Sequence, residues 1–427
     1  MLHNLNSTFG KTIVNGSTWL IIGQIFSKLS VLIGAIFVAR IIGKEIYGEL
    51  AILKSTINTF TSISSAAFGI AATKYIAEYR VTDIPKISRI ISLTTIIVFV
   101  FASAFTILII VFSSQLSISL LDNNQLENGL KISAIILLFS SINGLQQGIW
   151  IGFEKFKIIS LVNVFSGIIS IVAQTVGAYY FGLTGALFGY GSLFVLQFII
   201  NQHLLKKLFN QNVIKISLNG MMNEISIVWK FILPTMLSGV IVMPIVWICN
   251  TFLVNQNGGY SEMASFDVSL QWQALIIFIP SNISKVILPF ISKIRGQNKS
   301  YKNHMKLFIS LTFILTLCLS IIISLSSNYI LGFYGDDFTS SSSVLIIMCA
   351  AGVFMSLNSV IGQVITTENK MWFGFLFNVI WAISLLTTSY FLIQYYESAV
   401  GLALAYLISY IILFVIQRIF YSKLSLS

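Results

Sequence analysis

Stretches of about 20 mostly apolar residues recur along the whole chain, which is the length that a helix needs to cross a bilayer. The chain has 427 residues, of which 56% are hydrophobic and only 9% are charged. A soluble protein of this length would need far more charge on its surface. We therefore predict an all-α polytopic membrane protein.

The apolar runs predict twelve spans, joined by short connections except near 207–227 and 285–304. The predicted spans are 17–40, 47–74, 87–113, 131–153, 157–181, 183–205, 228–254, 260–284, 305–327, 341–365, 371–394 and 398–420. Pro234 and Pro244 predict kinks in the seventh span, because proline lacks the N–H that continues a helix. Residues 1–17 are polar and lead directly into a full span, so we expect no cleavable signal peptide.

The basic residues predict the orientation in the membrane. With a cytoplasmic N-terminus, 20 of the 25 lysines and arginines fall on the cytoplasmic side and three on the outer side, while Lys28 and Lys54 lie inside spans. The positive-inside rule demands such an asymmetry. Both termini are therefore predicted to be cytoplasmic. The asymmetry also accounts for the net charge of +11 without a nucleic-acid partner.

Four short sequence matches indicate an internal repeat. They pair YGELA with YSEMA, Gly148…Glu154 with Gly362…Glu368, Asn163-Val164 with Asn378-Val379, and GALFGY with GLALAY, at offsets that rise from 213 to 216. The matches predict an N-terminal six-helix bundle at 1–206, a cytoplasmic linker at 207–227 and a C-terminal six-helix bundle at 228–427. Six spans in each half make the repeat parallel, with a central cavity between the halves.

A polar row runs along the second predicted span. Lys54, Asn58, Thr61 and Ser65 follow one another at intervals of four, three and four residues, which places them on one helical face. Ionisable groups in a span usually face a bundle interior or a water-filled cavity. The alternative is that Lys54 lies close enough to the helix end to reach the headgroups.

The repeat favours the cavity for this lysine. Asp267 occupies the position equivalent to Lys54, and Gln271 the position equivalent to Asn58. Each charge lies seven residues after the tyrosine that opens its motif, a depth of about 10 Å. A short aspartate cannot reach the headgroups from there as easily as a lysine. A buried structural pair of Lys54 and Asp267, which could act as a gate, remains the alternative.

Lys28 lies near the middle of the first span, on one face with Gln24. A charge there costs at least about 2.5–3.5 kcal/mol, so we predict that Lys28 faces the cavity. The candidate substrate-binding residues are Gln24, Lys28, Lys54, Asn58, Asp267 and Gln271. The sequence contains no Walker A motif and no His/Glu metal motif. We therefore expect no enzyme, no metal and no cofactor.

Two motifs resemble those of a known family. Ala39-Arg40-Ile41-Ile42-Gly43 followed by Tyr47-Gly48 is similar to the A-R-x-L-G-x3-Y-G signature of polysaccharide-biosynthesis flippases, with Ile42 in place of the usual leucine. Gly335-Asp336-Asp337-Phe338 resembles the G-x-x-F of the same family. These are the O-antigen type flippases of the multidrug/oligosaccharidyl-lipid/polysaccharide exporter superfamily. The resemblance extends over the whole chain, through twelve spans in two halves.

The resemblance implies a substrate and partners. The substrate would be an oligosaccharide on undecaprenyl diphosphate, as in O-antigen and lipopolysaccharide biosynthesis, moved to the outer leaflet of the bacterial inner membrane by alternating access. Membrane lipids would be partners, with a polysaccharide polymerase and a chain-length regulator as further candidates. Family members have cationic lumens, and Lys28 and Lys54 fit that description.

Two rival functions remain. A multidrug cation antiporter of the same superfamily would need acidic groups in its cavity, where Asp267 is the one clear intramembrane acid. A membrane polysaccharide polymerase or acyltransferase would need reactive groups in outer loops, which here are short.

Overall fold

The computed structural model describes residues 8–212, 214–216, 219–294, 298–367 and 371–424. Side chains are described over 23–278, except 213, 217, 218, 238 and 240, and again over 306–362 and 372–421. Within these ranges the chain is all-helical, without a β-strand, as the sequence predicts. Glu368 of the second repeat match and residues 213 and 217–218 of the predicted linker lie outside the described part.

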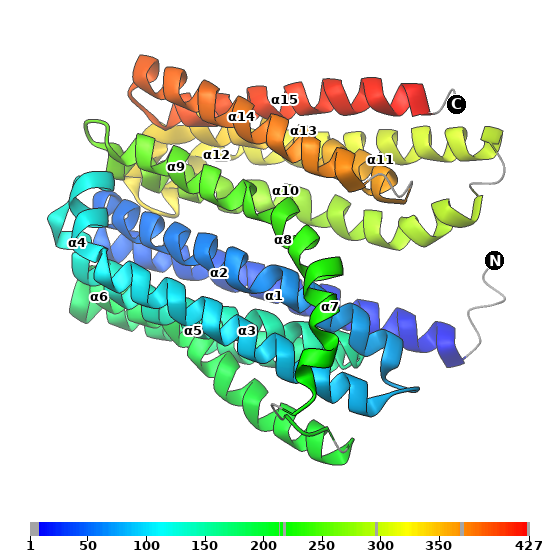
Figure 1. Ribbon diagram of the computed structural model, residues 1–427. Helices are drawn as coiled ribbons and strands as arrows, with labels where there is room; N and C mark the ends of the chain where they lie inside the picture. The colour runs from blue at the N-terminus through cyan, green and yellow to red at the C-terminus, as the bar shows by residue number, and fades with distance from the viewer. Residues whose placement is uncertain (1–7, 213, 217–218, 295–297, 368–370, 425–427) are drawn as a thin grey trace. The chain divides into compact units, whose positions relative to one another are not determined.

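The chain forms two compact units (Figure 1). Unit 1 comprises Met1–Ile42 and Leu53–Met243. Its elements are α1 (Thr8–Ile42), most of α2 (Lys44–Tyr79), α3 (Ile84–Val111), α4 (Ser113–Gln115), a π-helical turn (Leu116–Leu120), a 3₁₀ turn (Asn124–Leu126), α5 (Glu127–Gly152), α6 (Phe156–Gln211), a 3₁₀ turn (Met221–Glu224), α7 (Ile225–Ile227), a π-helical turn (Val228–Ile232) and α8 (Leu233–Val240).

Unit 2 comprises Gly43–Ile52 and Pro244–Ser427, so the first residues of α2 pack with the C-terminal helices. Its other elements are α9 (Val242–Val254), α10 (Gly259–Ile294), α11 (Asn298–Leu325), α12 (Ser327–Gly332), a 3₁₀ turn (Asp336–Ser341), α13 (Ser342–Thr367), α14 (Met371–Tyr396) and α15 (Ala399–Leu424). These two units are defined by how the helices pack. The predicted six-helix bundles at 1–206 and 228–427 are defined by the sequence repeat, and they stay a prediction.

Nine helices of the described chain are long and apolar enough to cross a membrane. The count is below the predicted twelve for two reasons. The polar helices α2 and α10 are not among the nine, and α6 holds two predicted spans in one helix of 56 residues. Gly182, with φ 55° and ψ −133°, interrupts α6 between these spans. This backbone conformation is open to glycine because it has no Cβ.

A buried apolar cluster holds the helices of unit 1 together. Phe68 of α2, Ile91 of α3, Trp150 of α5 and Leu205 of α6 are all part of it, and each is almost fully buried. Burying an aliphatic or aromatic side chain of this size contributes roughly 1.5–3 kcal/mol. This packing joins α2, α3, α5 and α6.

Candidate functional site

A small polar pocket in unit 1 contains the side chain of Lys54. Its volume is about 20 Å³, room for about one water molecule. Four helical segments line it: α1, α2 and the two arms of α6. The lining residues are Ser27, Ser30, Val31, Lys54, Gly167, Ser170, Gln174, Tyr190 and Leu193.

The interruption of α6 at Gly182 brings the two arms of this helix together at the pocket. Ser170 on the first arm donates a hydrogen bond of 3.0 Å to the carbonyl of Gly189 on the second. Gln174 Nε2 in turn donates to Ser170 Oγ at 3.0 Å. Ser170 and Gln174 are buried, so these bonds also satisfy polar groups that would be costly to leave unpaired.

Lys54 is 9% exposed, although it carries a charge. Its Nζ lies 5.1 Å from the centroid of the Tyr190 ring, a cation–π distance. The pocket thus offers the ammonium an aromatic face, serine hydroxyls and an amide. Such a site can hold the lysine ammonium in place. The ammonium can then bind an anionic group, because lysine binds phosphate as a point charge.

The other candidate residues of unit 1 differ in their surroundings. Gln24 and Lys28 are half-buried on α1, one turn apart, and neither belongs to the lining of the Lys54 pocket. Asn58 is exposed, whereas Ser65 is buried and donates to the carbonyl of Thr61 at 2.9 Å. The predicted row on α2 therefore runs through more than one environment.

Asp267 and Gln271 lie together in unit 2, where Tyr47 joins them. Gln271 Nε2 donates to Asp267 Oδ2 at 2.7 Å and to Tyr47 Oη at 2.9 Å. Tyr47 Oη donates to the same carboxylate oxygen at 2.9 Å. The carboxylate thus accepts two bonds, one from α2 and one from its own helix, α10. Hydrogen bonds to a charged acceptor are stronger than neutral ones.

The two family motifs also meet in unit 2. Phe338 of the G-x-x-F motif is buried against Tyr47, with ring centroids 6.2 Å apart. Lys44 Nζ donates to the carbonyl of Asp337 at 3.1 Å and to Ser341 Oγ at 3.0 Å. Burial lowers the pKa of the Lys44 ammonium, and the carboxylates of Glu262 and Asp337 oppose that shift. The contacts anchor the start of α2 in unit 2.

The structure therefore divides the candidate residues between the units. Gln24, Lys28, Lys54 and Asn58 belong to unit 1 and Asp267 and Gln271 to unit 2, so the predicted Lys54–Asp267 pair stays a prediction. Sequence reasoning missed Tyr47 and Tyr190 as partners of the two charges. Both stand in repeat motifs, at the start of YGELA and the end of GALFGY, which is the signal that could have found them.

Comparison with known proteins places the chain in a family. A family model described as polysaccharide biosynthesis protein matches residues 13–295, well over half of the chain. The EPS I polysaccharide export inner membrane protein EpsE of Ralstonia solanacearum is 23% identical over 201 residues, 46% of this chain and 45% of that protein. The chain thus spans just under half the length of this curated relative.

Solved structures show a shared fold. An inward-facing multidrug resistance MATE family transporter of the MOP superfamily has a TM-score of 0.80 at 14% identity, covering 96% of this chain and 99% of that chain. The lipid II flippase MurJ, in an inward closed conformation, has a TM-score of 0.77 at 18% identity, covering 95% and 87%. The resemblance drawn from the two sequence motifs is confirmed, and the chain belongs to the polysaccharide biosynthesis protein family.

Proposed function

We propose that the chain is a flippase for an oligosaccharide linked to undecaprenyl diphosphate, moving it from the cytoplasmic to the outer leaflet by alternating access. The observation that carries the proposal is the burial of Lys54 in a polar pocket of unit 1. A diphosphate carries negative charge that must leave water, and a cation at membrane depth lowers that cost. In this role the chain is a transporter, and it catalyses no covalent step.

The relatives support the substrate class and the location. EpsE is named as a polysaccharide export inner membrane protein, and MurJ as a lipid II flippase. We infer that this chain also lies in a bacterial inner membrane and handles a lipid-linked sugar of the O-antigen type. Membrane lipids are then partners, and a polysaccharide polymerase and chain-length regulator would act on the product.

Helix starts support twelve spans in two repeats. Three pairs of helices begin at positions that are 215 residues apart. They are α2 and α10 (Lys44 and Gly259), α5 and α13 (Glu127 and Ser342), and α6 and α14 (Phe156 and Met371). Gly43 and Gly258 have positive φ at the same offset, as have Gly182 and Glu397. These offsets fall within the range of 213 to 216 of the sequence matches, and at the start of α2 and α10 they exceed the YGELA–YSEMA offset of 213 by two residues. Counting α2 and α10 as spans and α6 as two spans would raise nine to twelve.

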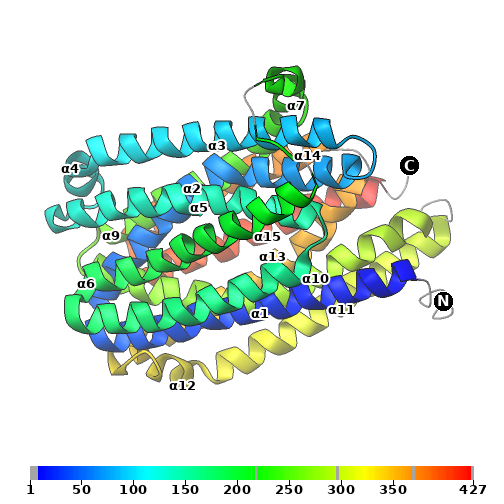
Figure 2. The same ribbon diagram turned by 90° about the horizontal axis from the view of Figure 1, so that it is seen from below.

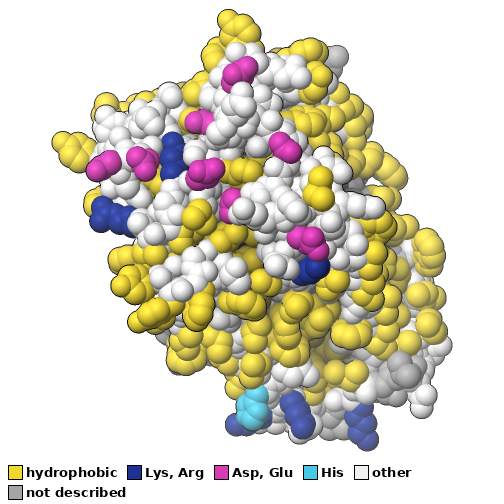
Figure 3. Space-filling view, turned by 90° about the vertical axis from the view of Figure 1, so that its left-hand side faces the viewer, with side chains coloured by type: hydrophobic (Ala, Val, Ile, Leu, Met, Phe, Trp, Pro, Cys, Tyr) yellow, Lys and Arg dark blue, Asp and Glu magenta, His cyan; other side chains and the backbone are white. Residues whose placement is uncertain are grey.

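The distribution of charge supports the proposed orientation, with both termini in the cytoplasm. Figure 3 shows the face that the left-hand side of Figure 1 presents. Acidic side chains are scattered over it, and basic ones are few apart from its lower margin. We propose that this face is the outer one, because basic residues are retained on the cytoplasmic side.

A multidrug cation antiporter is the second candidate, because MATE transporters share the fold and Asp267 supplies a carboxylate. Such a transporter would place its acid, and no lysine, where the cargo binds. The buried Lys54 favours an anionic cargo instead.

The experiment replaces Lys54 in a strain whose chromosomal copy is deleted. We expect Lys54→Ala to abolish surface glycan display at a normal protein level, and Lys54→Arg to retain part of it. Lys155→Ala, an exposed lysine outside the pocket, is the matched control and should display normally. Full display from Lys54→Ala would refute the role of this lysine.

A further inference from the structure

A second, larger cavity opens on unit 1 between the first turns of α3 and the described residues 212, 215, 219, 220 and 223. Its volume is about 860 Å³. Its polar lining includes Ser88, Arg89, Asn212, Lys215, Asn219 and Asn223. Two cations line this groove and none of its described lining residues is acidic, so it suits an anionic ligand with several acceptor oxygens.

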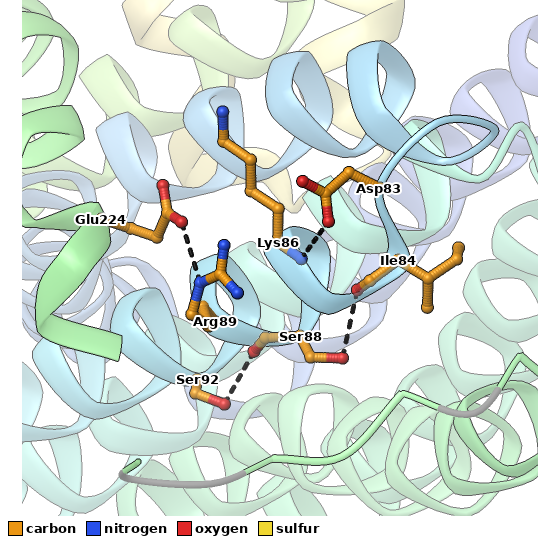
Figure 4. A network of polar contacts seen from close by, with 7 residues as sticks. All are labelled: Asp83, Ile84, Lys86, Ser88, Arg89, Ser92 and Glu224. Carbon is orange, nitrogen blue, oxygen red and sulfur yellow. Dashed lines mark hydrogen bonds and ion pairs between the residues drawn. The ribbon is translucent and has the colours of Figure 1, made fainter. Parts of the chain in front are cut away.

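The guanidinium of Arg89 is fixed in direction. Its Nε donates to Glu224 Oε1 at 2.9 Å, and the Glu224 side chain is only 9% exposed (Figure 4). The Nε–H of Arg89 makes the bond to Glu224. The other four N–H groups, on the two terminal nitrogens, lie on the edge of the guanidinium away from Nε. Glu224 offsets one positive charge, so the net positive charge of the groove comes from the exposed Lys215.

The backbone at the start of α3 is also ordered for this role. Asp83 caps the helix by accepting from the N–H of Lys86 at 2.8 Å, and Ser88 and Ser92 donate to carbonyls one turn before them (Figure 4). Arg89 therefore projects from a capped, rigid helix start.

The groove lies at the level of lipid headgroups if α3 crosses the bilayer. The apolar helix Ile84–Val111 has 28 residues, a length of about 42 Å, against a hydrocarbon core of about 30 Å. Shared between the two ends, the excess of about 12 Å places the first turn in the headgroup region and Ser88 and Arg89 at its boundary with the hydrocarbon core. By the positive-inside asymmetry this is the cytoplasmic end.

An amphipathic segment follows the groove along the chain. In Met221–Ile232, Met222, Ile225 and Trp229 are 60%, 39% and 67% exposed, and their spacing of three and four residues puts them on one face. The opposite face is buried, with Ile227 and Ile232 in the apolar cluster of unit 1. The segment runs crosswise to α3 and α5 in Figure 1, and Figure 2 shows it nearly end-on.

A crosswise helical segment with an outward apolar face and a tryptophan is typical of a chain lying in the membrane interface. Lys230, also exposed, adds a cation beside that face. The apolar face and the cationic groove are adjoining parts of one stretch of chain. Together they match the two halves of a phospholipid, the acyl chains and the phosphate.

We propose that this groove binds the phosphate of an anionic membrane lipid, held by Arg89 and Lys215, while the lipid's acyl chains lie against Met222, Ile225 and Trp229. This lipid is a resident of the cytoplasmic leaflet and distinct from the cargo. The proposal therefore does not depend on what the chain transports.

Trp229 allows a direct test in the full chain reconstituted in phosphatidylcholine vesicles. A minor fraction of brominated phosphatidylglycerol, or the same fraction of brominated phosphatidylcholine, quenches nearby tryptophans. The difference between the parent and Trp229→Phe isolates the signal of Trp229. We expect stronger quenching by the brominated anionic lipid, with loss of this preference in Lys215→Ala and in Arg89→Ala.

Two controls make the result decisive. Lys155→Ala removes an exposed lysine outside the groove and should keep the preference. Arg89→Ala removes the ion-pair partner of Glu224. If this variant does not fold, Lys215→Ala tests the groove, because Lys215 is exposed. Equal quenching by both lipids, or an unchanged preference in Lys215→Ala, would overturn the proposal. Loss of the preference when inorganic phosphate replaces chloride at matched ionic strength would point to free phosphate and overturn it too.

Discussion

The hydroxyl of Tyr47 donates a hydrogen bond of 2.9 Å to Oδ2 of Asp267. Tyr47 opens the YGELA motif, and Asp267 lies seven residues after the tyrosine that opens YSEMA. The bond thus joins the first turn of α2 to α10 in unit 2, and crosses between positions that the repeat does not make equivalent. It gives the acidic member of the proposed charge pair a partner of its own.

Removing this donor should weaken unit 2. Tyr47→Phe keeps the ring but takes a bond from a carboxylate, which should lower the free energy of unfolding by about 1–3 kcal/mol. The measurement is the Tm of the purified protein in detergent. Tyr395→Phe, at a side chain 80% exposed in the same unit, is the control and should unfold with the parent. Equal Tm values for both variants would show that the bond contributes nothing.

Gly48 permits a close approach that no other residue would allow. A Cβ at this position would lie 1.7 Å from the carbonyl oxygen of Tyr260, so α2 and α10 would have to separate. We expect Gly48→Ala to lower the Tm and the amount of folded protein. Gly374→Ala, where a Cβ would meet nothing within 4 Å, should leave the Tm unchanged or raise it. A parent-like Tm in Gly48→Ala would contradict the packing of the two repeat motifs.

Lys28 offers a test of the proposed cationic lumen apart from Lys54. A charge near the centre of a span is retained at a cost of at least about 2.5–3.5 kcal/mol, which suggests a use for it. Lys28→Ala should abolish glycan display at a normal protein level, and Lys28→Arg should keep part. Normal display from Lys28→Ala would mean that its charge is structural or idle.

The roles of Lys54 and Asp267 can be separated by exchanging them. If Lys54 binds the diphosphate, Lys54→Asp should lose transport, the double variant with Asp267→Lys should not regain it, and Asp267→Asn should be mild. An asparagine still accepts the bond from Tyr47. Recovery of transport in the double variant would instead favour a Lys54–Asp267 gate, because each single reversal would leave a charge uncompensated.

The orientation can be tested with cysteines placed in a chain whose three native cysteines have been replaced. Cysteines at 125 and 337 should react with an impermeant thiol reagent from outside intact cells, and one at 155 should not. The 20-to-3 distribution of basic residues motivates this expectation. The reverse pattern would contradict both the topology and the parallel repeat.

Apolar periodicity was enough to predict the helices. The predicted span 371–394 corresponds to α14 (Met371–Tyr396), and 398–420 to α15 (Ala399–Leu424), because burial in lipid requires an unbroken apolar run. The seventh span is interrupted where its prolines predict a kink. It is a π-helical turn, α8 and α9, with a break next to Ile241. Pro244 lacks the N–H that would bond the carbonyl of Val240, which accounts for the break.

The site was less predictable, because helical spacing defines a face but not what that face meets. The partner of Lys54 is Tyr190, whose position depends on the interruption of α6 at Gly182. The row from Lys54 to Ser65 shares a face, yet Asn58 is exposed while Lys54 is buried. Neither fact follows from spacing alone.

The central claim is that the chain translocates a lipid-linked oligosaccharide. The most direct measurement follows a fluorescent oligosaccharide on undecaprenyl diphosphate in vesicles that contain the purified chain, using a membrane-impermeant quencher to count the sugars on each side. We predict that sugars initially on one side become accessible on the other with the parent chain, and that Lys54→Ala slows this to the rate of protein-free vesicles. Translocation by the parent no faster than in protein-free vesicles would contradict the account.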